Sequence, residues 1–374
     1  MSQAANRMPL IDALKAIAAM LVLLTHFSSY GPLAATANEA FPAIFGWFYD
    51  YGRMAVQVFL VIAGFLAARG LSREGQALSV SPLPLIWKRY LRLVVPYLVA
   101  IALAIVAAAI ANQWLDDEAI PDRATFTQWL AHAFLLHGLL GFDALSAGVW
   151  YIAIDFQLFA LMAILLWSGR IRIVAPALVL GVASLSLFWF NRDASWDNWA
   201  IYFFGSYGLG AAAWWASERR QMSAWLGVIA TIAIASLVVD FRLRIVLALG
   251  VALLLGFGRR SGLLESWPNF RPLAFLGQIS YSVFLVHFPV LLIANGLYAR
   301  FELNSTSAAL SCLALAWAAS ILVATLFYRW IESPAASQRL TGAIGWLAGL
   351  TWDGLRAAPR YLAAKFRRLL PDRA

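Results

Sequence analysis

Long hydrophobic runs dominate this sequence and limit the folds open to it. A helix that crosses a bilayer needs about 17 to 25 mostly apolar residues, and about ten runs of that length occur between residues 11 and 330. Hydrophobic residues make up 62% of the 374 positions and charged residues only 13%, whereas about a quarter of a soluble domain is charged. We therefore predict an all-α, polytopic integral membrane helix bundle with about ten transmembrane helices. The predicted spans are 11–30, 45–68, 90–111, 148–168, 172–190, 199–216, 223–240, 242–258, 274–297 and 307–330.

The apolar stretch 126–141 is shorter and more mixed in composition. We interpret it as a helix that lies at the membrane interface, and an eleventh span is the alternative. Its histidines, His132 and His137, are five positions apart, which corresponds to about 140° around a helix. That separation is poor geometry for joint metal binding, so we predict two surface histidines and no metal site.

Basic residues form short clusters between the apolar runs, and most of them fall on one side of the predicted spans. Cytoplasmic loops carry such an excess of Lys and Arg, so both termini are predicted to be cytoplasmic. Although the net charge is +9, this clustering is typical of an oriented membrane protein and gives no reason to expect a nucleic-acid partner. Residues 1–340 form one predicted transmembrane domain. Residues 341–374 are predicted to form a basic amphipathic tail that contacts membrane lipids on the cytoplasmic side.

Ionisable residues inside a span are usually functional, and the first span contains a notable pair. Lys15 and His26 are eleven residues apart, about three helical turns, so both face the same side with a rise of about 16 Å between them. Asp12 lies about 40° to the other side and can line the same cleft. The alternative is a Lys15 that extends to the membrane surface and a His26 that packs in the core.

Three further segments carry candidate site residues. Arg89 and Arg92 are three apart on one face of a helix and suit a polyphosphate, although they also fit simple positive-inside anchoring. Asp155 lies about as deep as His26, and could orient its imidazole or accept a hydrogen bond between helices. The cysteine count of one excludes an intrachain disulfide and a cysteine-based metal site. The remaining candidates are Trp150, Gln157, Tyr281 and His287.

Taken in order, these segments resemble acyltransferase family 3, a family of integral membrane acyltransferases that modify O-antigens and exopolysaccharides. The resemblance extends from residue 10 to about residue 334. This chain has Lys15 where the family often has arginine, and Asp155 where it commonly has glutamate. The segments that carry it are Lys15 with His26, Arg89 with Arg92, Trp150 with Asp155 and Gln157, the segment 276–287, and the segment 328–334.

The resemblance implies transfer of an acyl group, usually acetyl, from acyl-CoA to a sugar hydroxyl, in a bacterial inner membrane. Acetyl-CoA would be a co-substrate, with no bound cofactor, and the acceptor a polysaccharide, a lipid-linked oligosaccharide or another glycosylated molecule. His26 would be the general base and Asp155 would orient it, with His287 as the reserve base. Arg89, Arg92 and Lys15 would bind the donor. A route through an acyl-histidine stays open.

A transporter or flippase of a lipid-linked glycan is the alternative function, because buried charges in a ten-span bundle also suit substrate passage. That alternative predicts no thioester chemistry. The sequence shows no clear inverted repeat, which favours the acyltransferase.

Overall fold

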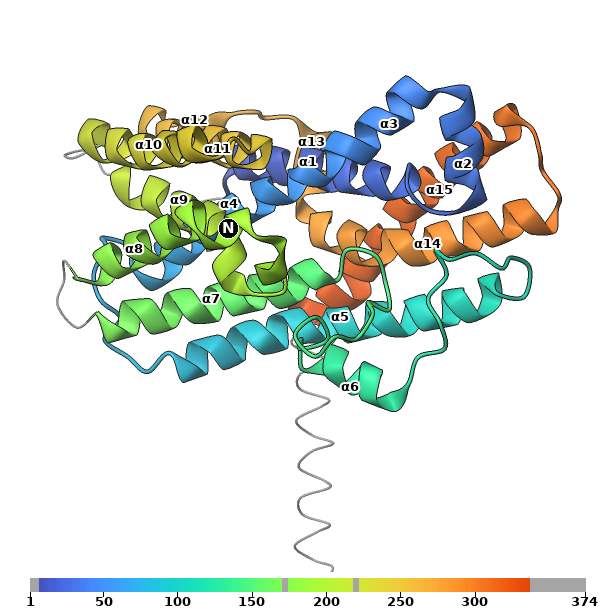
Figure 1. Cartoon of the computed structure of the whole chain (residues 1–374), viewed down its shortest axis with the longest axis horizontal. Coiled ribbons are helices and arrows are strands. Elements are labelled where there is room, and N and C mark those ends of the chain that lie inside the picture. Colours follow the sequence, from blue (N-terminus) through green and yellow to red (C-terminus); the bar gives the residue numbers. More distant parts are fainter. Residues whose placement is uncertain (1–6, 170–173, 218–221, 337–374) are drawn as a thin grey trace, which may run out of the picture. The chain divides into compact units, whose positions relative to one another are not determined.

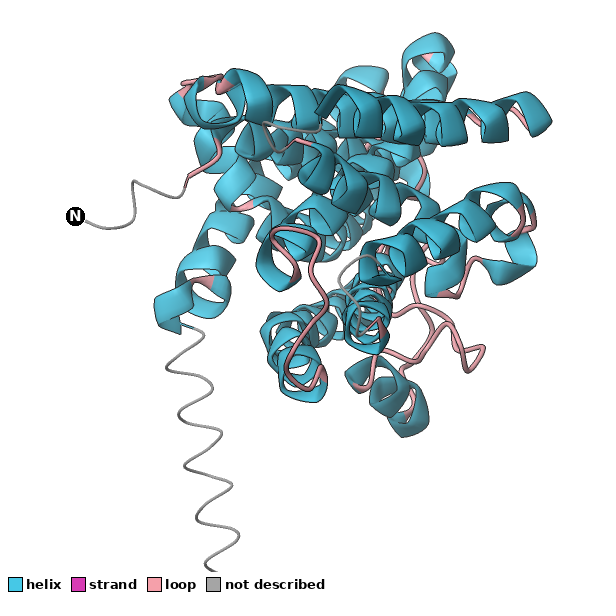
Figure 2. Ribbon diagram, turned by 90° about the vertical axis from the view of Figure 1, so that its left-hand side faces the viewer, coloured by secondary structure: helices cyan, strands magenta, loops and turns pink. Residues whose placement is uncertain are grey.

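The computed structural model describes residues 7–169, 174–217 and 222–336. Within these ranges every regular element is a helix, and Figure 2 shows no strand. The all-α prediction is therefore confirmed for the described part of the chain (Figure 1). The main helices are α1 (Pro9–Phe27), α2 (Gly31–Ala40), α3 (Pro42–Tyr51), α4 (Val56–Leu71), α5 (Leu83–Ala111), α6 (Phe126–Ala133), α7 (Trp150–Ser168), α8 (Val174–Phe188), α9 (Ala200–Ala216), α10 (Met222–Val239), α11 (Leu243–Ser261), α12 (Leu263–Ser266), α13 (Arg271–Gln278), α14 (Ser280–Arg300) and α15 (Thr306–Phe327).

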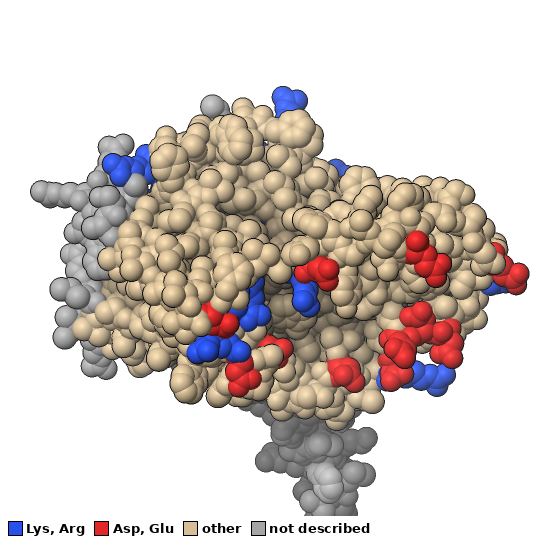
Figure 3. Space-filling view, turned by 45° about the horizontal axis from the view of Figure 1, so that its top comes forward, with Lys and Arg blue, Asp and Glu red and all other residues tan. Residues whose placement is uncertain are grey.

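Seven helical segments in the described residues are long and apolar enough to cross a membrane. They coincide with seven of the predicted spans, so the chain is an integral membrane protein. Helices also occupy the other three predicted positions, as α9, α10 and α11, but they are not among these seven. The number of spans and the side on which the termini lie therefore stay predictions. Most of the face in Figure 3 carries no charged side chain, as expected for a surface that contacts lipid.

The chain divides into two compact units, Met1–Thr325 and Leu326–Ala374. The predicted boundary at residue 340 and the predicted tail 341–374 lie outside the described residues. In the first unit, α9 is buried over almost its whole length and packs against α4, α8 and α11. Glycines permit the closest of these approaches, because a Cβ at Gly64 of α4 would lie 1.9 Å from the Tyr207 carbonyl oxygen of α9. Small residues let membrane helices approach in this way.

The predicted span 274–297 is wrong in one respect, because the helix is interrupted at Ile279. The preceding helix, α13, packs against α1, whereas α14 packs mainly against α5 and also contacts α1. The interruption therefore separates a segment that packs on α1 from one that packs mainly on α5. The contact of α13 with α1 is close, since a Cβ at Gly277 would lie 2.1 Å from the Asp12 carbonyl oxygen.

Candidate active site

Two histidines from distant parts of the sequence form a hydrogen-bonded pair at the centre of the candidate site. His26 lies in the last turn of α1, and His287 lies in the second turn of α14. His26 Nδ1 is 2.6 Å from His287 Nε2, and the two rings are parallel to within 5°. His287 is fully buried, whereas His26 is only partly buried. His26 is therefore the member of the pair that a substrate can reach.

The backbone of α14 determines which nitrogen of each ring carries a proton. His287 Nδ1 is 3.0 Å from the Val283 carbonyl oxygen, which can only accept a hydrogen bond. His287 Nδ1 therefore carries the proton, and its Nε2 is the acceptor in the neutral ring. His26 Nδ1 must then donate to His287. This chain of hydrogen bonds leaves the lone pair of His26 on Nε2.

Aromatic rings and a glycine form the walls around His26. Tyr30 lies 5.6 Å from the His26 ring between centroids, and Phe284 lies 6.3 Å from the His287 ring. Gly148, just before α7, has φ +79°, a conformation that glycine adopts without strain. A Cβ at Gly148 would lie 3.2 Å from His26 Cε1 and from Phe284. The loop before α7 therefore approaches the imidazole through backbone alone.

The carboxylate that was expected beside His26 has a different partner. Asp155 of α7 is buried and accepts a hydrogen bond from Arg89 of α5, with 2.5 Å between Oδ2 and the guanidinium nitrogen. The predicted contact of Asp155 with His26 is thus corrected: His287 holds the imidazole, and Asp155 neutralises a buried cation. The linear sequence could not reveal this exchange, because both pairings join helices that are far apart in the chain.

An aromatic contact links the histidine pair with the ion pair. Tyr151 lies one turn before Asp155 on α7, and its ring meets Phe284 edge to face at 5.6 Å. Phe284 in turn lies one turn before His287 on α14. The structure therefore brings four of the predicted site residues into one continuous region: His26, His287, Asp155 and Arg89.

Other predicted site residues lie elsewhere or have structural contacts. Arg92 is exposed, whereas Arg89 is half-buried. Lys15 Nζ lies 4.0 Å from Asp12, which also pairs with Arg7 at 3.0 Å. Two further candidates contact backbone: the Tyr281 hydroxyl donates to the Leu93 carbonyl at 3.1 Å, and Gln157 Oε1 accepts from the Ala200 amide at 3.0 Å.

Comparison with known proteins identifies the family. The family described as "Acyltransferase domain" matches residues 9–329, nearly the whole chain. The chain belongs to acyltransferase family 3. It is also similar to the peptidoglycan O-acetyltransferase OatA of Listeria monocytogenes, at 23% identity over 91% of this chain. The chain spans 57% of the length of that relative. No solved structure gave a significant match.

This acyltransferase has a basic cavity that sequence reasoning missed. Its volume is about 290 Å³, and four arginines line it together with Trp214 and Glu265. It lies at the N-terminal end of α1 and at the C-terminal ends of α4, α9 and α11. In the sequence these four arginines lie at separate positions and resemble ordinary positive-inside residues. The fold brings them together around one cavity. The four arginines are Arg7, Arg69, Arg73 and Arg259.

Trp214 lines this cavity and contacts Arg73 and Arg259. The Arg259 guanidinium lies 3.6 Å from the centre of the Trp214 ring system and donates to the Trp214 carbonyl at 2.7 Å. The Trp214 indole donates to the Arg73 carbonyl at 3.0 Å. Planar guanidiniums suit bidentate binding of phosphate. This arginine-lined cavity of the acyltransferase lies at the end of α1 opposite to His26.

The prediction that His132 and His137 are surface histidines is wrong. They are 0% and 2% exposed, and their rings stack at 4.1 Å. The predicted helix 126–141 ends at Ala133, and Leu135 has φ +58°, so the chain turns back and brings His137 onto His132. A separation of 140° applies only to one continuous helix, and the helix here ends between the two histidines. Within the described residues, no group of three or more His, Cys, Asp or Glu side chains is placed to bind a metal.

His137 should make the stability of the acyltransferase sensitive to acid. Burial, followed by the charge of His132, lowers the pKa of His137 to about 4 in the folded chain, against about 6.5 when unfolded. Below pH 6.5 the unfolded chain therefore binds a proton that the folded chain does not. The contribution of neutral His137 to the free energy of unfolding is fully present above about pH 6.5. The free energy of unfolding falls by about 3 kcal/mol as the pH approaches 4.

This dependence can be measured as the apparent melting temperature of the protein in nanodiscs between about pH 8 and pH 4. H137F, which removes the titrating group, is expected to flatten the acid limb of the curve. An unchanged slope in H137F would contradict this assignment.

Proposed function

We propose that this protein transfers an acyl group, in the first instance acetyl, from acyl-CoA to a hydroxyl of a sugar acceptor. The observation that carries the proposal is the His26–His287 pair, because it leaves a lone pair on Nε2 of a histidine that substrate can reach. Membership of acyltransferase family 3 supports the reaction class. The name of the Listeria relative supports O-acetylation of a glycan.

The reaction requires one proton acceptor and one leaving group. His26 Nε2 takes the proton of the acceptor hydroxyl as that oxygen attacks the thioester carbonyl. The carbon–sulfur bond then breaks, and the imidazolium returns its proton to the departing CoA sulfur. His287 holds the imidazole in the required tautomer, and so takes the orienting role first considered for Asp155. Direct transfer needs no further group, and an acyl-histidine intermediate is the alternative route.

The cavity lined by Arg7, Arg69, Arg73 and Arg259 supports a donor with several phosphates. Helix α1 leads from this cavity past Lys15 to His26, and Met8 and His26 are about 27 Å apart along its axis. An extended thioester arm would follow that direction. We propose that this basic end faces the cytoplasm of a bacterial cell, across its inner membrane, and that exposed Arg92 is a secondary donor contact.

Release of the CoA thiol from acetyl-CoA tests the proposal. Purified protein in nanodiscs should release thiol only when a glycan acceptor is added. R73A should raise the KM for acetyl-CoA about tenfold, since one charge-assisted phosphate contact contributes about 1.5 kcal/mol or more. R123A, another exposed arginine, outside the cavity, should leave the KM unchanged. If wild type neither binds acetyl-CoA nor releases thiol with any acceptor, the proposal fails, and flux of a lipid-linked glycan becomes the next assay.

A further inference from the structure

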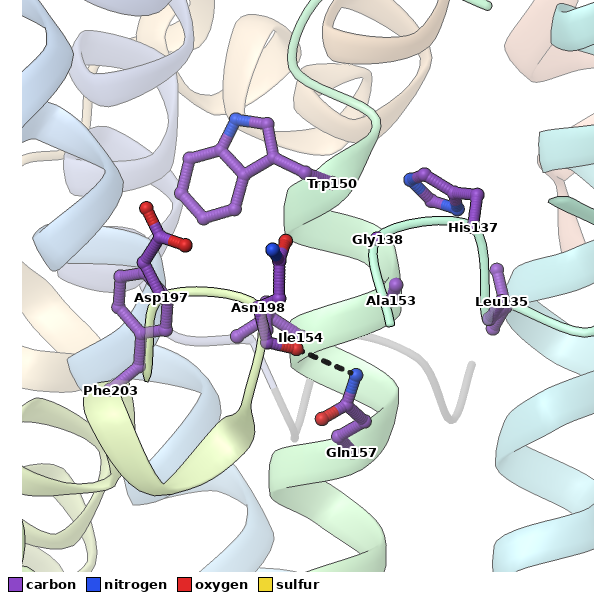
Figure 4. Close-up of a pocket in the computed structure, with 10 residues that line it drawn as sticks. All are labelled: Leu135, His137, Gly138, Trp150, Ala153, Ile154, Gln157, Asp197, Asn198 and Phe203. Carbon is purple, nitrogen blue, oxygen red and sulfur yellow. Dashed lines mark hydrogen bonds between the residues drawn. The ribbon is translucent and has the colours of Figure 1, made fainter. Parts of the chain in front are cut away.

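A second cavity, of about 200 Å³, lies beside the N-terminal half of α7 (Figure 4). Three segments form it: the turn that follows α6, one face of α7, and the loop that precedes α9 together with the first turn of α9. Figure 4 shows the Asp197 carboxylate and the Asn198 amide pointing toward the Trp150 indole, with His137 on the opposite side. The polar and aromatic residues that line it include His137, Trp150, Gln157, Asp197 and Asn198, together with Gly138.

Trp150 supplies an aromatic surface. Its side chain is 37% exposed, and its ring stacks on Phe203 at 5.5 Å and 28°. Phe203 is itself buried, so it supports the indole from within the helix bundle. A ring held in this way is a rigid platform on which an apolar face of a ligand can stack.

His137 is the unusual polar group of this cavity. Both of its ring nitrogens are buried without a hydrogen-bonding partner, whereas His132, on which it stacks, has partners for both nitrogens. Buried polar groups are nearly always paired. The neutral ring that burial favours has one donor and one acceptor on different nitrogens, and each of them matches a separate hydroxyl group.

The loop before α9 completes the polar lining, and its position is fixed. Gln157 of α7 accepts from the Ala200 amide at 3.0 Å and donates to the Asn198 carbonyl at 3.5 Å. Gly138 fits against Asn198, because a Cβ there would lie 2.7 Å from Asn198 Oδ1. Among the described residues, the side-chain carboxylate of Asp197 and the side-chain amide of Asn198 have no hydrogen-bonding partner. Both groups are therefore available to a ligand.

We propose that this cavity binds one ring of a neutral glycan acceptor. A sugar ring presents an apolar face to Trp150, and hydroxyl groups that can donate to Asp197 and both donate to and accept from His137. Asp197 disfavours an anionic ring. This inference rests on the proposed function, since it names the acceptor subsite of the same enzyme.

The location of the cavity also sets a minimum acceptor length. Trp150 is two residues after Gly148, which packs on His26. Trp150, Ile154 and Gln157 line the cavity, whereas Tyr151 and Asp155, on another face of α7, contact the catalytic region. A glycan held in the cavity must therefore pass over the N-terminus of α7 to reach His26. At least two sugar rings are needed, one for each position.

Binding of N-acetylglucosamine oligomers, from the monomer to the tetramer, to the full chain in nanodiscs tests the proposal without requiring catalysis. Affinity should rise with length. W150A should weaken tetramer binding about tenfold, because stacking of a ring on an aromatic side chain contributes about 1 kcal/mol or more. D197A, at an exposed position that is not expected to affect folding, should also weaken it. W47A is the matched control, because Trp47 is 49% exposed and outside the cavity.

The outcomes separate the two proposals. If the tetramer binds wild type, W150A and D197A equally, or binds none of them, the subsite is refuted. If W150A and D197A lose binding but wild type releases no thiol from acetyl-CoA, the subsite stands and the proposed transfer fails. If transfer occurs and W150A and D197A leave the acceptor KM unchanged, the transfer stands and the subsite fails.

Discussion

H26A is expected to lower the rate of acyl transfer by about 10³-fold, within the range that a positioned general base contributes. The loss should appear in kcat, with little change in acetyl-CoA binding, because His26 lies far along α1 from the arginine cavity. H287F should lower kcat by a smaller factor, about 10- to 100-fold, since it removes only the acceptor that fixes the tautomer of His26. The assay is thiol release with a saturating glycan acceptor.

Two further variants distinguish a positioning role of His287 from a structural one. H287Q keeps a side-chain oxygen that can accept from His26 Nδ1, so it should retain more activity than H287F, and the pH dependence of kcat should differ between the two. Free imidazole added to H26A should restore part of the rate. Full activity in H26A would exclude His26 as the base, and equal activity in H287Q and H287F would remove the tautomer argument.

D155N is expected to destabilise the fold by about 2 kcal/mol. The substitution leaves the Arg89 guanidinium in a largely buried position without its counterion, and breaking a buried pair in this way costs about 3 to 5 kcal/mol. The smaller value is expected here because the Arg89 side chain is 27% exposed. The measurement is the free energy of unfolding in mixed micelles titrated with a denaturing detergent.

A double variant that removes both charges tests whether the stability lost in D155N comes from the unpaired charge of Arg89. R89M combined with D155L should recover most of the stability that D155N loses, because apolar residues can replace a buried ion pair without net cost. R192Q is the matched control in an exposed pair, in which Arg192 and Asp240 are 44% and 38% exposed. It should change stability by less than about 1 kcal/mol. If D155N is as stable as wild type, the ion pair does not contribute to the fold.

The length and hydropathy of the apolar runs were sufficient to predict the helical membrane bundle, because each spanning helix must satisfy its own backbone hydrogen bonds. The helix boundaries predicted from hydropathy were wrong where the chain changes direction. The break at Ile279 and the turn at Leu135 both lie inside apolar stretches, so hydropathy alone predicts continuous helices there. The error at Leu135 in turn placed His132 and His137 on the surface.

Hydropathy and the ordered motifs were enough to predict the membrane class and the family, and the candidate residues stood out because intramembrane Lys, Arg, Asp and His residues are rare. Their partners became visible only in the folded chain. His26 pairs with His287 and Asp155 pairs with Arg89, although helical periodicity permitted other pairings. The physical reason is that spacing along one helix fixes which residues share a face, whereas the neighbour of that face depends on how separate helices pack.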